Sequence, residues 1–300
     1  MNKVSIWLST MRLRTLPLSI SGIILGSCLA YDKGFFQWGI FALAILTTLS
    51  FQILSNFAND YGDGIKGTDN NERIGPERAI QSGKITPKQL LNAIKLNIVI
   101  SIILAVLLIY YAFGTENLIL IIIFLLLGIS SIIAAMRYTM GNNAYGYKGL
   151  GDVFVFLFFG LVSVIGCYVL FAKQMDTITL LPACTIGLLS AAVLNLNNMR
   201  DIASDLKSNK VTLAVKLGKV WALRYHNILI ISAFITSALF GFLHYVSPYN
   251  LIYFVAYIPL AIHLKKANTV IDAKLFDPEL KKLALTTVLL AVLMGIGQLL

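Results

Sequence analysis

Long runs of apolar residues, separated by short polar connections, dominate this chain and restrict what it can fold into. Crossing the hydrocarbon core of a bilayer, about 30 Å thick, takes roughly 20 helical residues. Lipid offers no partners for backbone N–H and C=O groups, so each run is expected to form a helix. Nine runs are candidates: Leu16–Tyr31, Trp38–Ala58, Leu90–Phe113, Leu118–Met136, Val153–Ala172, Ile178–Met199, Val220–Leu243, Leu251–Leu264 and Leu283–Leu300. The sequence therefore predicts an all-α, polytopic membrane protein with about nine transmembrane helices, of which the eighth is the weakest because it is short and contains Pro259.

The low share of charged residues excludes a water-soluble globular fold. Only 13% of the residues are charged and 58% are hydrophobic, whereas a soluble domain carries about 25% charged residues. The net charge of +10 is not gathered in a basic domain outside the apolar runs. We therefore expect the lipid bilayer as a partner, and no nucleic acid.

The basic residues are unevenly divided between the two sides of the predicted membrane. All 24 Lys and Arg residues except Lys33 and Lys173 fall in the N-terminal segment, in connections on its side or just inside the runs that follow these connections. An excess of Lys and Arg marks cytoplasmic connections. The sequence thus predicts a multi-pass protein of the cytoplasmic (inner) membrane, with its N-terminus and long polar connections in the cytoplasm.

Two polar connections on this basic side carry similar acidic motifs. In the first, Asp63 follows Asn59 by four residues, and in the second Asn197, Asp201 and Asp205 have the same spacing. Residues four apart lie on one face of a helix, so each motif directs two or three oxygen ligands the same way. Carboxylate and amide oxygens are what Mg²⁺ accepts.

Basic residues stand among the acids of both motifs and between them: Arg73, Arg78 and Lys84, then Lys148, then Arg200, Lys207 and Lys210. Carboxylates mixed with cations suit a diphosphate bridged by a metal ion, whose charge needs both. Asp60 and Asp69 can join the first motif. The alternative is a set of solvated charges and helix caps. Two such connections on one side favour a site, because charges at a bilayer edge are costly to place.

The recurrence of the motif also bears on domain organisation. Four predicted helices separate its two occurrences. We expect a single membrane domain, 1–300, with two related halves at about 1–150 and 151–300.

A third polar segment contains Tyr138, Tyr147, Lys148 and Asp152. These side chains can line the mouth of a cavity. Equally, tyrosine favours membrane interfaces, and Lys148 and Asp152 are four residues apart and can simply pair.

The ordered set of motifs resembles that of the UbiA-type intramembrane prenyltransferases. The matching features are Arg12–Pro17, Ala58–Asp63, Gly67, Asp69, Arg73, Gly75–Pro76, Tyr138–Thr139, Gly151–Asp152, Asn197–Asp201, Asp205 and Thr212–Ala214. Members that act on 4-hydroxybenzoate commonly carry an Asp four residues after the position of Asp63. This chain has Gly67 there and Asp69 two residues later, which is similar to the branch acting on 1,4-dihydroxy-2-naphthoate in menaquinone synthesis. Leu13 stands where many members carry proline.

The resemblance implies a bundle of helices around a central cavity that opens towards the membrane and is capped by cytoplasmic connections. It implies Mg²⁺-dependent transfer of a polyprenyl chain from polyprenyl diphosphate to 1,4-dihydroxy-2-naphthoate. Carbon dioxide and diphosphate would leave, giving demethylmenaquinone.

The resemblance also assigns roles to residues. Those expected to hold Mg²⁺ are Asp60, Asp63, Asp69, Asp201 and Asp205. Those expected to contact the diphosphate are Asn59, Arg73, Arg78, Asn197, Arg200 and Lys210. Catalysis is assigned to Asp63, Asp69, Asp201, Asp205, Tyr138 and Lys148.

Three other functions were compared with this one. CDP-alcohol phosphotransferases share Asp-x-x-Asp-Gly, present here as Asp60 to Gly64, but they continue with Ala-Arg, where this chain has Ile65–Thr68. A cation transporter needs carboxylates near the membrane midplane, whereas all 14 acidic residues lie in connections or at run ends. Another aromatic acceptor, such as 4-hydroxybenzoate, stays an open alternative, and the sequence does not reveal the prenyl length.

Overall fold

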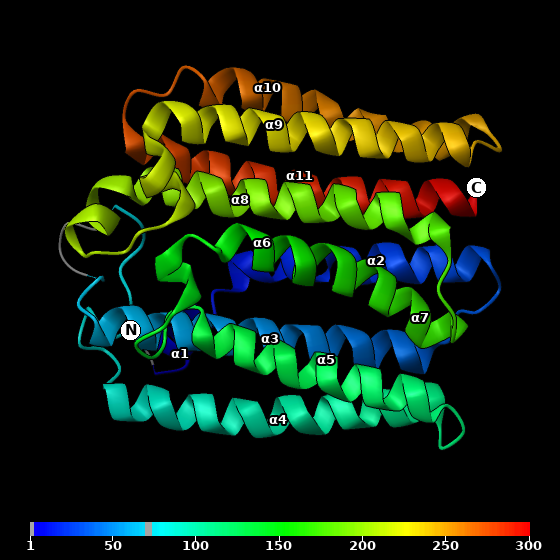
Figure 1. The fold of residues 1–300 in the computed structure, drawn as a ribbon, viewed down its shortest axis with the longest axis horizontal. Helices are drawn as coiled ribbons and strands as arrows, with labels where there is room; N and C mark the ends of the chain where they lie inside the picture. The colour runs from blue at the N-terminus through cyan, green and yellow to red at the C-terminus, as the bar shows by residue number, and fades with distance from the viewer. Residues whose placement is uncertain (1–2, 70–73) are drawn as a thin grey trace.

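The long helices lie side by side in one elongated bundle (Figure 1). The computed structural model describes residues 3–69 and 74–300, and every regular element within these ranges is helical. The helices are α1 (Lys3–Thr10), α2 (Leu16–Asp32), α3 (Trp38–Ile65), α4 (Pro87–Phe113), α5 (Leu118–Arg137), α6 (Gly151–Val155), α7 (Cys167–Ala172), α8 (Leu180–Lys207), α9 (Leu213–Leu243), α10 (Tyr257–Ala267) and α11 (Phe276–Leu299). A π-helix, Phe156–Gly166, joins α6 and α7 into one continuous span.

Seven helical stretches in the described part of the chain are long and apolar enough to cross a bilayer. They correspond to α3, α4, α5, the α6–α7 span, α8, α9 and α11. The first predicted span forms α2, which is shorter at 17 residues. The eighth is a 3-10 stretch, Pro248–Ala256, that continues into α10, with Pro259 in the first turn where its missing N–H is tolerated. The predicted all-α polytopic class is confirmed, and the count of nine is approximate.

Every second connection lies at the same end of the bundle. The connections α3–α4, α5–α6, α8–α9 and α10–α11 meet at the left of Figure 1, and α2–α3, α4–α5, α7–α8 and α9–α10 lie at the right. We call the first set the basic end, since it carries most of the Lys and Arg residues. Both acidic motifs are thereby brought to one end, because the first occupies the last two turns of α3 and the second lies within the last three turns of α8, and both helices finish there.

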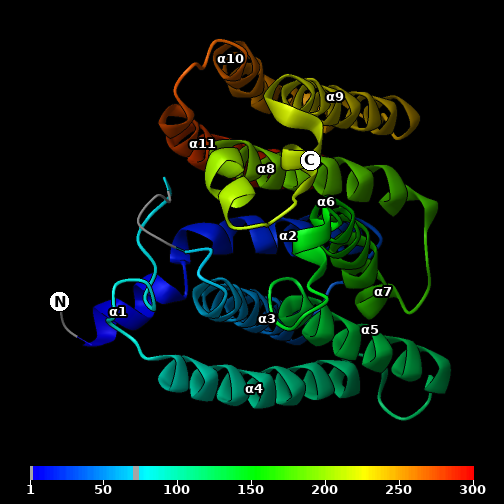
Figure 2. The same cartoon turned by 60° about the vertical axis from the view of Figure 1, so that its left-hand side comes forward.

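The helices form layers that Figure 2 shows from another direction. Helices α9 and α10 lie at one edge and α4 at the other, with α2 and the α6–α7 span between α8 and α3. Glycines bring the π-helix close to both neighbours. A Cβ on Gly26 of α2 would lie 2.6 Å from the Val164 carbonyl oxygen, and one on Gly160 would lie 2.6 Å from that of Ala183 in α8. Small residues permit this close backbone approach between membrane helices.

A buried polar cluster ties α9, α10 and α11 together near the basic end. The Nε2 atoms of His226 and His263 lie 3.0 Å apart, and His263 Nδ1 lies 2.9 Å from Glu279 Oε2. The other Glu279 oxygen accepts a hydrogen bond from Lys282 at 2.8 Å. His226 and Glu279 are fully buried. This cluster is expected to stabilise the fold, since buried polar groups are costly without partners.

We expect Glu279→Ala to lower the free energy of unfolding by about 3–5 kcal/mol, because it removes one partner from a buried charged cluster. Thermal unfolding in detergent, followed by circular dichroism, measures the loss. The matched control is Glu77→Ala, which removes an exposed ion pair with Lys84 of 2.7 Å and is expected to cost less than about 1 kcal/mol. Equal losses in the two variants would contradict the role of the cluster.

Candidate active site

A cavity of about 530 Å³ runs along the middle of the bundle. Its ionic part, at the basic end, is lined by Asn59, Asp63, Asp69, Arg78, Asn197, Arg200, Asp201, Asp205 and Lys210. Its apolar part extends towards the opposite end and includes Ile23, Leu108, Ile109, Phe124, Phe159 and Leu170. One continuous space therefore joins a region suited to charged groups with a region suited to a hydrocarbon chain.

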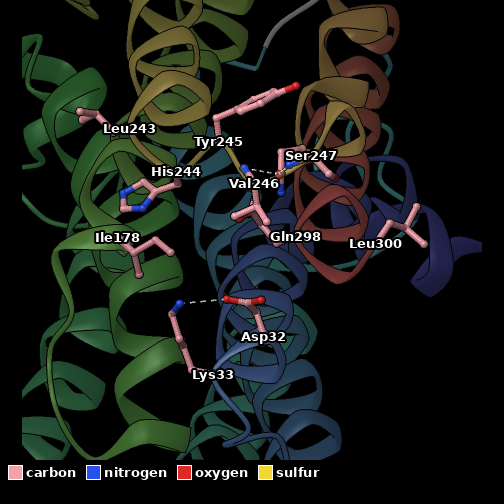
Figure 3. Close-up of a pocket in the computed structure, with 11 residues that line it drawn as sticks. Asp32, Lys33, Ile178, Leu243, His244, Tyr245, Val246, Ser247, Gln298 and Leu300 are labelled. Carbon is pink, nitrogen blue, oxygen red and sulfur yellow. Dashed lines mark hydrogen bonds and ion pairs between the residues drawn. The ribbon is translucent and has the colours of Figure 1, made fainter.

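A second cavity, of about 390 Å³, lies at the opposite end (Figure 3). Lys33 and Asp32 form an ion pair of 3.1 Å at its edge, and His244 and Gln298 also line it. None of the candidate site residues that the sequence predicts and the structure describes lines this second cavity. The larger cavity is therefore the candidate site.

The first motif reaches this cavity through Asp63, in the last turn of α3. Asp63 Oδ1 accepts a hydrogen bond from the Tyr147 hydroxyl at 2.7 Å, and Oδ2 accepts one from Lys210 Nζ at 3.0 Å. Lys210 comes from the connection that follows α8, and its Nζ is also 4.0 Å from Asp205. A single ammonium group thus bridges the two motifs.

Lys210 keeps its charge in this position. Burial by itself would lower the pKa of its ammonium, but the nearby charges of Asp63 and Asp205 outweigh burial and raise that pKa above its ordinary value. The ordinary value is about 10.4, so the ammonium is charged at neutral pH. Its stabilising contribution is present below that value and is lost only as the pH rises through the raised pKa.

Acidic side chains at these positions need cations for a further reason. Asp63 and Asp205 lie in the last turns of α3 and α8, where the partial negative charge of the macrodipole disfavours carboxylates. Asp63, Asp201 and Asp205 are nevertheless at most 9% exposed. Buried acids in an unfavourable field are typical of functional sites rather than of stabilising ones.

Asp60 is placed differently from its neighbours in the motif. Its carboxylate is 2% exposed and pairs with Arg12, and the Nε of Arg78 lies 3.5 Å from the same oxygen. Asp60 follows Asn59 by one residue, which turns its side chain to another face of α3. It is outside the set of described residues that line the cavity. The predicted metal role of Asp60 is therefore not favoured by its position, and it holds two arginines instead.

The second motif is organised around Arg200, whose side chain is 1% exposed. Its Nε and Nη2 donate to the two carboxylate oxygens of Asp201 at 2.8 and 2.7 Å. Nη2 also donates to Asn197 Oδ1 at 2.9 Å, and Nη1 donates to Asp277 of α11 at 2.7 Å. Arg200 thus contacts protein carboxylates directly and lines the cavity, and its predicted contact with the diphosphate stays a prediction.

The third polar segment supplies two tyrosines rather than a lysine. Tyr138 lines the cavity, and burial raises the pKa of its hydroxyl to about 12, so it is neutral at physiological pH. Tyr147 contacts Asp63 directly. Lys148, predicted to be catalytic, is exposed and donates to Asn143 at 3.1 Å. It ends the short helix Tyr145–Lys148 and is not among the described residues that line the cavity.

The other predicted residues have mixed outcomes. Asp69 and Arg78 line the cavity, and both interact with other groups. Arg73 lies outside the described residues. Arg12 and Asp277 were not singled out for the site, although Arg12 belongs to a matching N-terminal segment. Asp277 carries no motif signal, because only the folding of the last helix beside α8 brings it to Arg200.

We expect Tyr147→Phe to reduce turnover by about 10- to 100-fold, since it removes a hydrogen bond to a carboxylate, worth about 1.5–3 kcal/mol. The Tyr147 hydroxyl donates to Asp63, so the Thr68 hydroxyl, 2.6 Å away, is the donor in their contact. Steady-state kinetics measures the change. Thr68→Val, which removes only the second hydrogen bond, is expected to cost less, and the reverse order would contradict this assignment.

The donor set suits Mg²⁺ better than a metal held by protein alone. Carboxylates from both motifs and the amides of Asn59 and Asn197 line one cavity. In the described part of the chain, no three acidic, histidine or cysteine side chains converge on a single point. Mg²⁺ usually takes one or two carboxylates and completes its coordination with water and substrate phosphates. The residues therefore fit a magnesium ion that binds together with a diphosphate.

The fold and this site define an integral membrane protein whose helical bundle encloses a cavity with an ionic mouth and an apolar body. Residues 19–295 match the model of the UbiA prenyltransferase family. The chain is 44% identical over 240 residues to 1,4-dihydroxy-2-naphthoate octaprenyltransferase of Escherichia coli (strain K12), covering 80% of this chain and 77% of that protein. It is 40% identical over 299 residues to the enzyme of the same name in Haemophilus influenzae, covering 99% and 96%. The chain belongs to the UbiA prenyltransferase family.

Solved structures share the same fold. The structure of a UbiA homolog from Archaeoglobus fulgidus bound to DMAPP and Mg²⁺ superimposes with a TM-score of 0.62 at 14% identity, covering 95% of this chain and 99% of that one. The apo structure of a UbiA homolog from Aeropyrum pernix K1 gives 0.64 at 13% identity, covering 96% of each. At such identities the likeness concerns the fold alone.

Proposed function

We propose that this protein transfers a polyprenyl chain from polyprenyl diphosphate to 1,4-dihydroxy-2-naphthoate, releasing diphosphate and CO₂ and forming demethylmenaquinol, the reduced form of demethylmenaquinone. The observation that carries the proposal is one cavity in which both acidic motifs meet at the ionic end of an apolar space. The relatives at 44% and 40% identity, named for this reaction, supply the acceptor.

The ionic end binds the diphosphate. Asp63, Asp69, Asp201 and Asp205 hold Mg²⁺, assisted by the amides of Asn59 and Asn197. Arg78 and Lys210 move from carboxylates to phosphate oxygens, while Arg200 stays on Asp201. Mg²⁺, when bound, neutralises the negative charge that grows on the leaving diphosphate. The lysine and arginine groups stabilise the same charge, and their effect is largest in the transition state.

The apolar part of the cavity holds the prenyl chain and excludes water. The C–O bond to diphosphate breaks, and the allylic carbon bonds to the ring carbon that carries the carboxylate. The C–CO₂ bond then breaks, and its electron pair restores the aromatic ring. Water would otherwise capture the allylic carbon, so an anhydrous chamber lined by Phe124, Phe159 and Leu170 protects the intermediate.

The test incubates purified protein in detergent with Mg²⁺, a long polyprenyl diphosphate and either 1,4-dihydroxy-2-naphthoate or 4-hydroxybenzoate. Mg²⁺-dependent demethylmenaquinol, detected as demethylmenaquinone after oxidation in air, with CO₂ released only from the naphthoate, is the expected result. Product from 4-hydroxybenzoate alone would support prenyl transfer as the reaction but would identify 4-hydroxybenzoate, and not the naphthoate, as the acceptor. No product from either, with folded protein, would overturn the proposal.

The basic end is proposed to face the cytoplasm, in the inner membrane. Cysteine variants of Lys84, at the basic end, and Thr115, in the α4–α5 turn, test this orientation; both positions are exposed. A membrane-impermeant maleimide applied to spheroplasts is expected to label Thr115→Cys and to label Lys84→Cys only after lysis. The opposite pattern would reverse the orientation.

A further inference from the structure

Asp277, at the start of the last helix, contacts the second acidic motif without belonging to it. It lies in the first turn of α11, where a carboxylate is favoured by the helix dipole. Its Oδ1 accepts a hydrogen bond from Arg200 Nη1 at 2.7 Å, and it lines the same cavity. The Asp277 side chain is 41% exposed, so water could solvate its carboxylate, and burial does not force it to pair with Arg200.

Arg200 is held on two edges by this arrangement. One edge of the guanidinium, Nε with Nη2, donates to both oxygens of Asp201. The remaining Nη1 donates to Asp277. A planar guanidinium that is hydrogen-bonded on both sides is fixed in rotation as well as in position. Without Asp277, this side chain, which is 1% exposed, would keep Asp201 and Asn197 on the Nε–Nη2 edge and would have no partner on Nη1.

The orientation of Arg200 determines that of Asp201. Each carboxylate oxygen has two lone pairs, and Arg200 engages one on each oxygen of Asp201. The remaining lone pairs point away from Arg200, and Asp201 lines the cavity.

We propose that Asp277 is a positioning residue that acts through Arg200: it holds the free lone pairs of Asp201 towards the cavity, where they can bind a divalent cation. The inference rests on the proposed function, because that function assigns Asp201 to the Mg²⁺–diphosphate complex. Loss of a residue that orients a metal ligand typically costs 10- to 100-fold in metal affinity or activity.

The test measures the unfolding temperature of each variant as Mg²⁺ is titrated at a fixed, saturating concentration of inorganic diphosphate. Asp277→Ala is expected to raise the half-saturating Mg²⁺ concentration 10- to 100-fold. Asp277→Asn is expected to lose less, because its amide oxygen still accepts from Arg200. The matched control, Asp272→Asn, removes a carboxylate charge from the preceding exposed turn and keeps its cap to Lys274. It is expected to stay within twofold of the wild type.

A double-mutant cycle separates positioning from direct binding. In an Arg200→Gln background, Asp277→Ala is expected to change the half-saturating Mg²⁺ concentration by less than twofold, since the residue through which it acts is gone. Additive losses, or equal losses in Asp277→Asn and Asp277→Ala, would mean that Asp277 binds the metal itself and would overturn the inference. So would an Asp277→Ala variant whose Mg²⁺ dependence matches the wild type.

The two proposals fail in different ways. A wild-type protein that is stabilised by Mg²⁺ and diphosphate but forms no prenylated product would overturn the proposed function, and the titrations would still decide the role of Asp277. A wild-type protein that forms product, with an Asp277→Ala variant of unchanged Mg²⁺ dependence, would overturn the inference alone.

Discussion

Asp63→Ala and Asp201→Ala are each expected to lower turnover by at least about 10³-fold while leaving the protein folded in detergent. The estimate takes the upper range for removing a single group that stabilises transition-state charge. Asp63 also holds Lys210 and Tyr147, so its loss disturbs the ionic end as well as the metal. Steady-state kinetics with saturating Mg²⁺ measures the change, and thermal unfolding checks the fold.

Isosteric variants and a remote control make this result decisive. Asp63→Asn and Asp201→Asn retain the shape and one of the two acceptor oxygens but lose the charge, so they are expected to be nearly as inactive as the alanine variants. Glu77→Ala, on the exposed Lys84 pair, is expected to retain activity. Near-normal turnover in folded Asp63→Ala or Asp201→Ala would remove the basis for the metal–diphosphate assignment.

Mg²⁺ and diphosphate are expected to bind in a mutually dependent way, because the carboxylates for the metal are already paired with the cations for the phosphate. Lys210 lies 3.0 Å from Asp63, and its raised pKa prevents release by deprotonation at neutral pH. Mg²⁺ alone must therefore compete with the ammonium, whereas diphosphate draws the ammonium away. A coupling free energy of about 1–3 kcal/mol is typical of such linkage.

Lys210→Met tests this exchange. The variant is expected to bind Mg²⁺ alone about tenfold more tightly than the wild type, because Asp63 loses its competing cation. Its kcat/KM for the prenyl diphosphate is expected to fall by about 10²- to 10³-fold, because the variant lacks the positive charge that stabilises the leaving diphosphate. Calorimetric titrations with Mg²⁺, with inorganic diphosphate and with both together measure the coupling. Wild-type protein that binds Mg²⁺ equally well with and without diphosphate would contradict the mechanism.

The class of fold was predictable from the sequence because a bilayer imposes few choices. Apolar runs of span length must be helical, and the alternation of connections then places every second one at the same end. This is why Asn59, Asp63, Asn197, Asp201 and Asp205 were expected on one side, and the structure brings them to one cavity. The proposal of two related halves, about 1–150 and 151–300, rests on this recurrence alone.

Contacts that depend on side-chain direction and helix packing were less predictable. Spacing correctly grouped Asn59 with Asp63, yet Asp60 turns towards Arg12 and Arg78. Lys148 and Tyr147 are adjacent in sequence, but only the tyrosine reaches Asp63. The role of Asp277 depends on the distance between two helices that no local pattern encodes.

The division of the cavity into an ionic mouth and an apolar body has a consequence for how such enzymes diversify. The mouth is built from helix ends and connections, whereas the body is built from the inner faces of spans such as α4 and α7. Substitutions at distant sites without shared partners usually act additively. A lineage can therefore alter the length of hydrocarbon that it accepts, through positions such as Leu108 and Leu170, without readjusting the charges that cleave the donor.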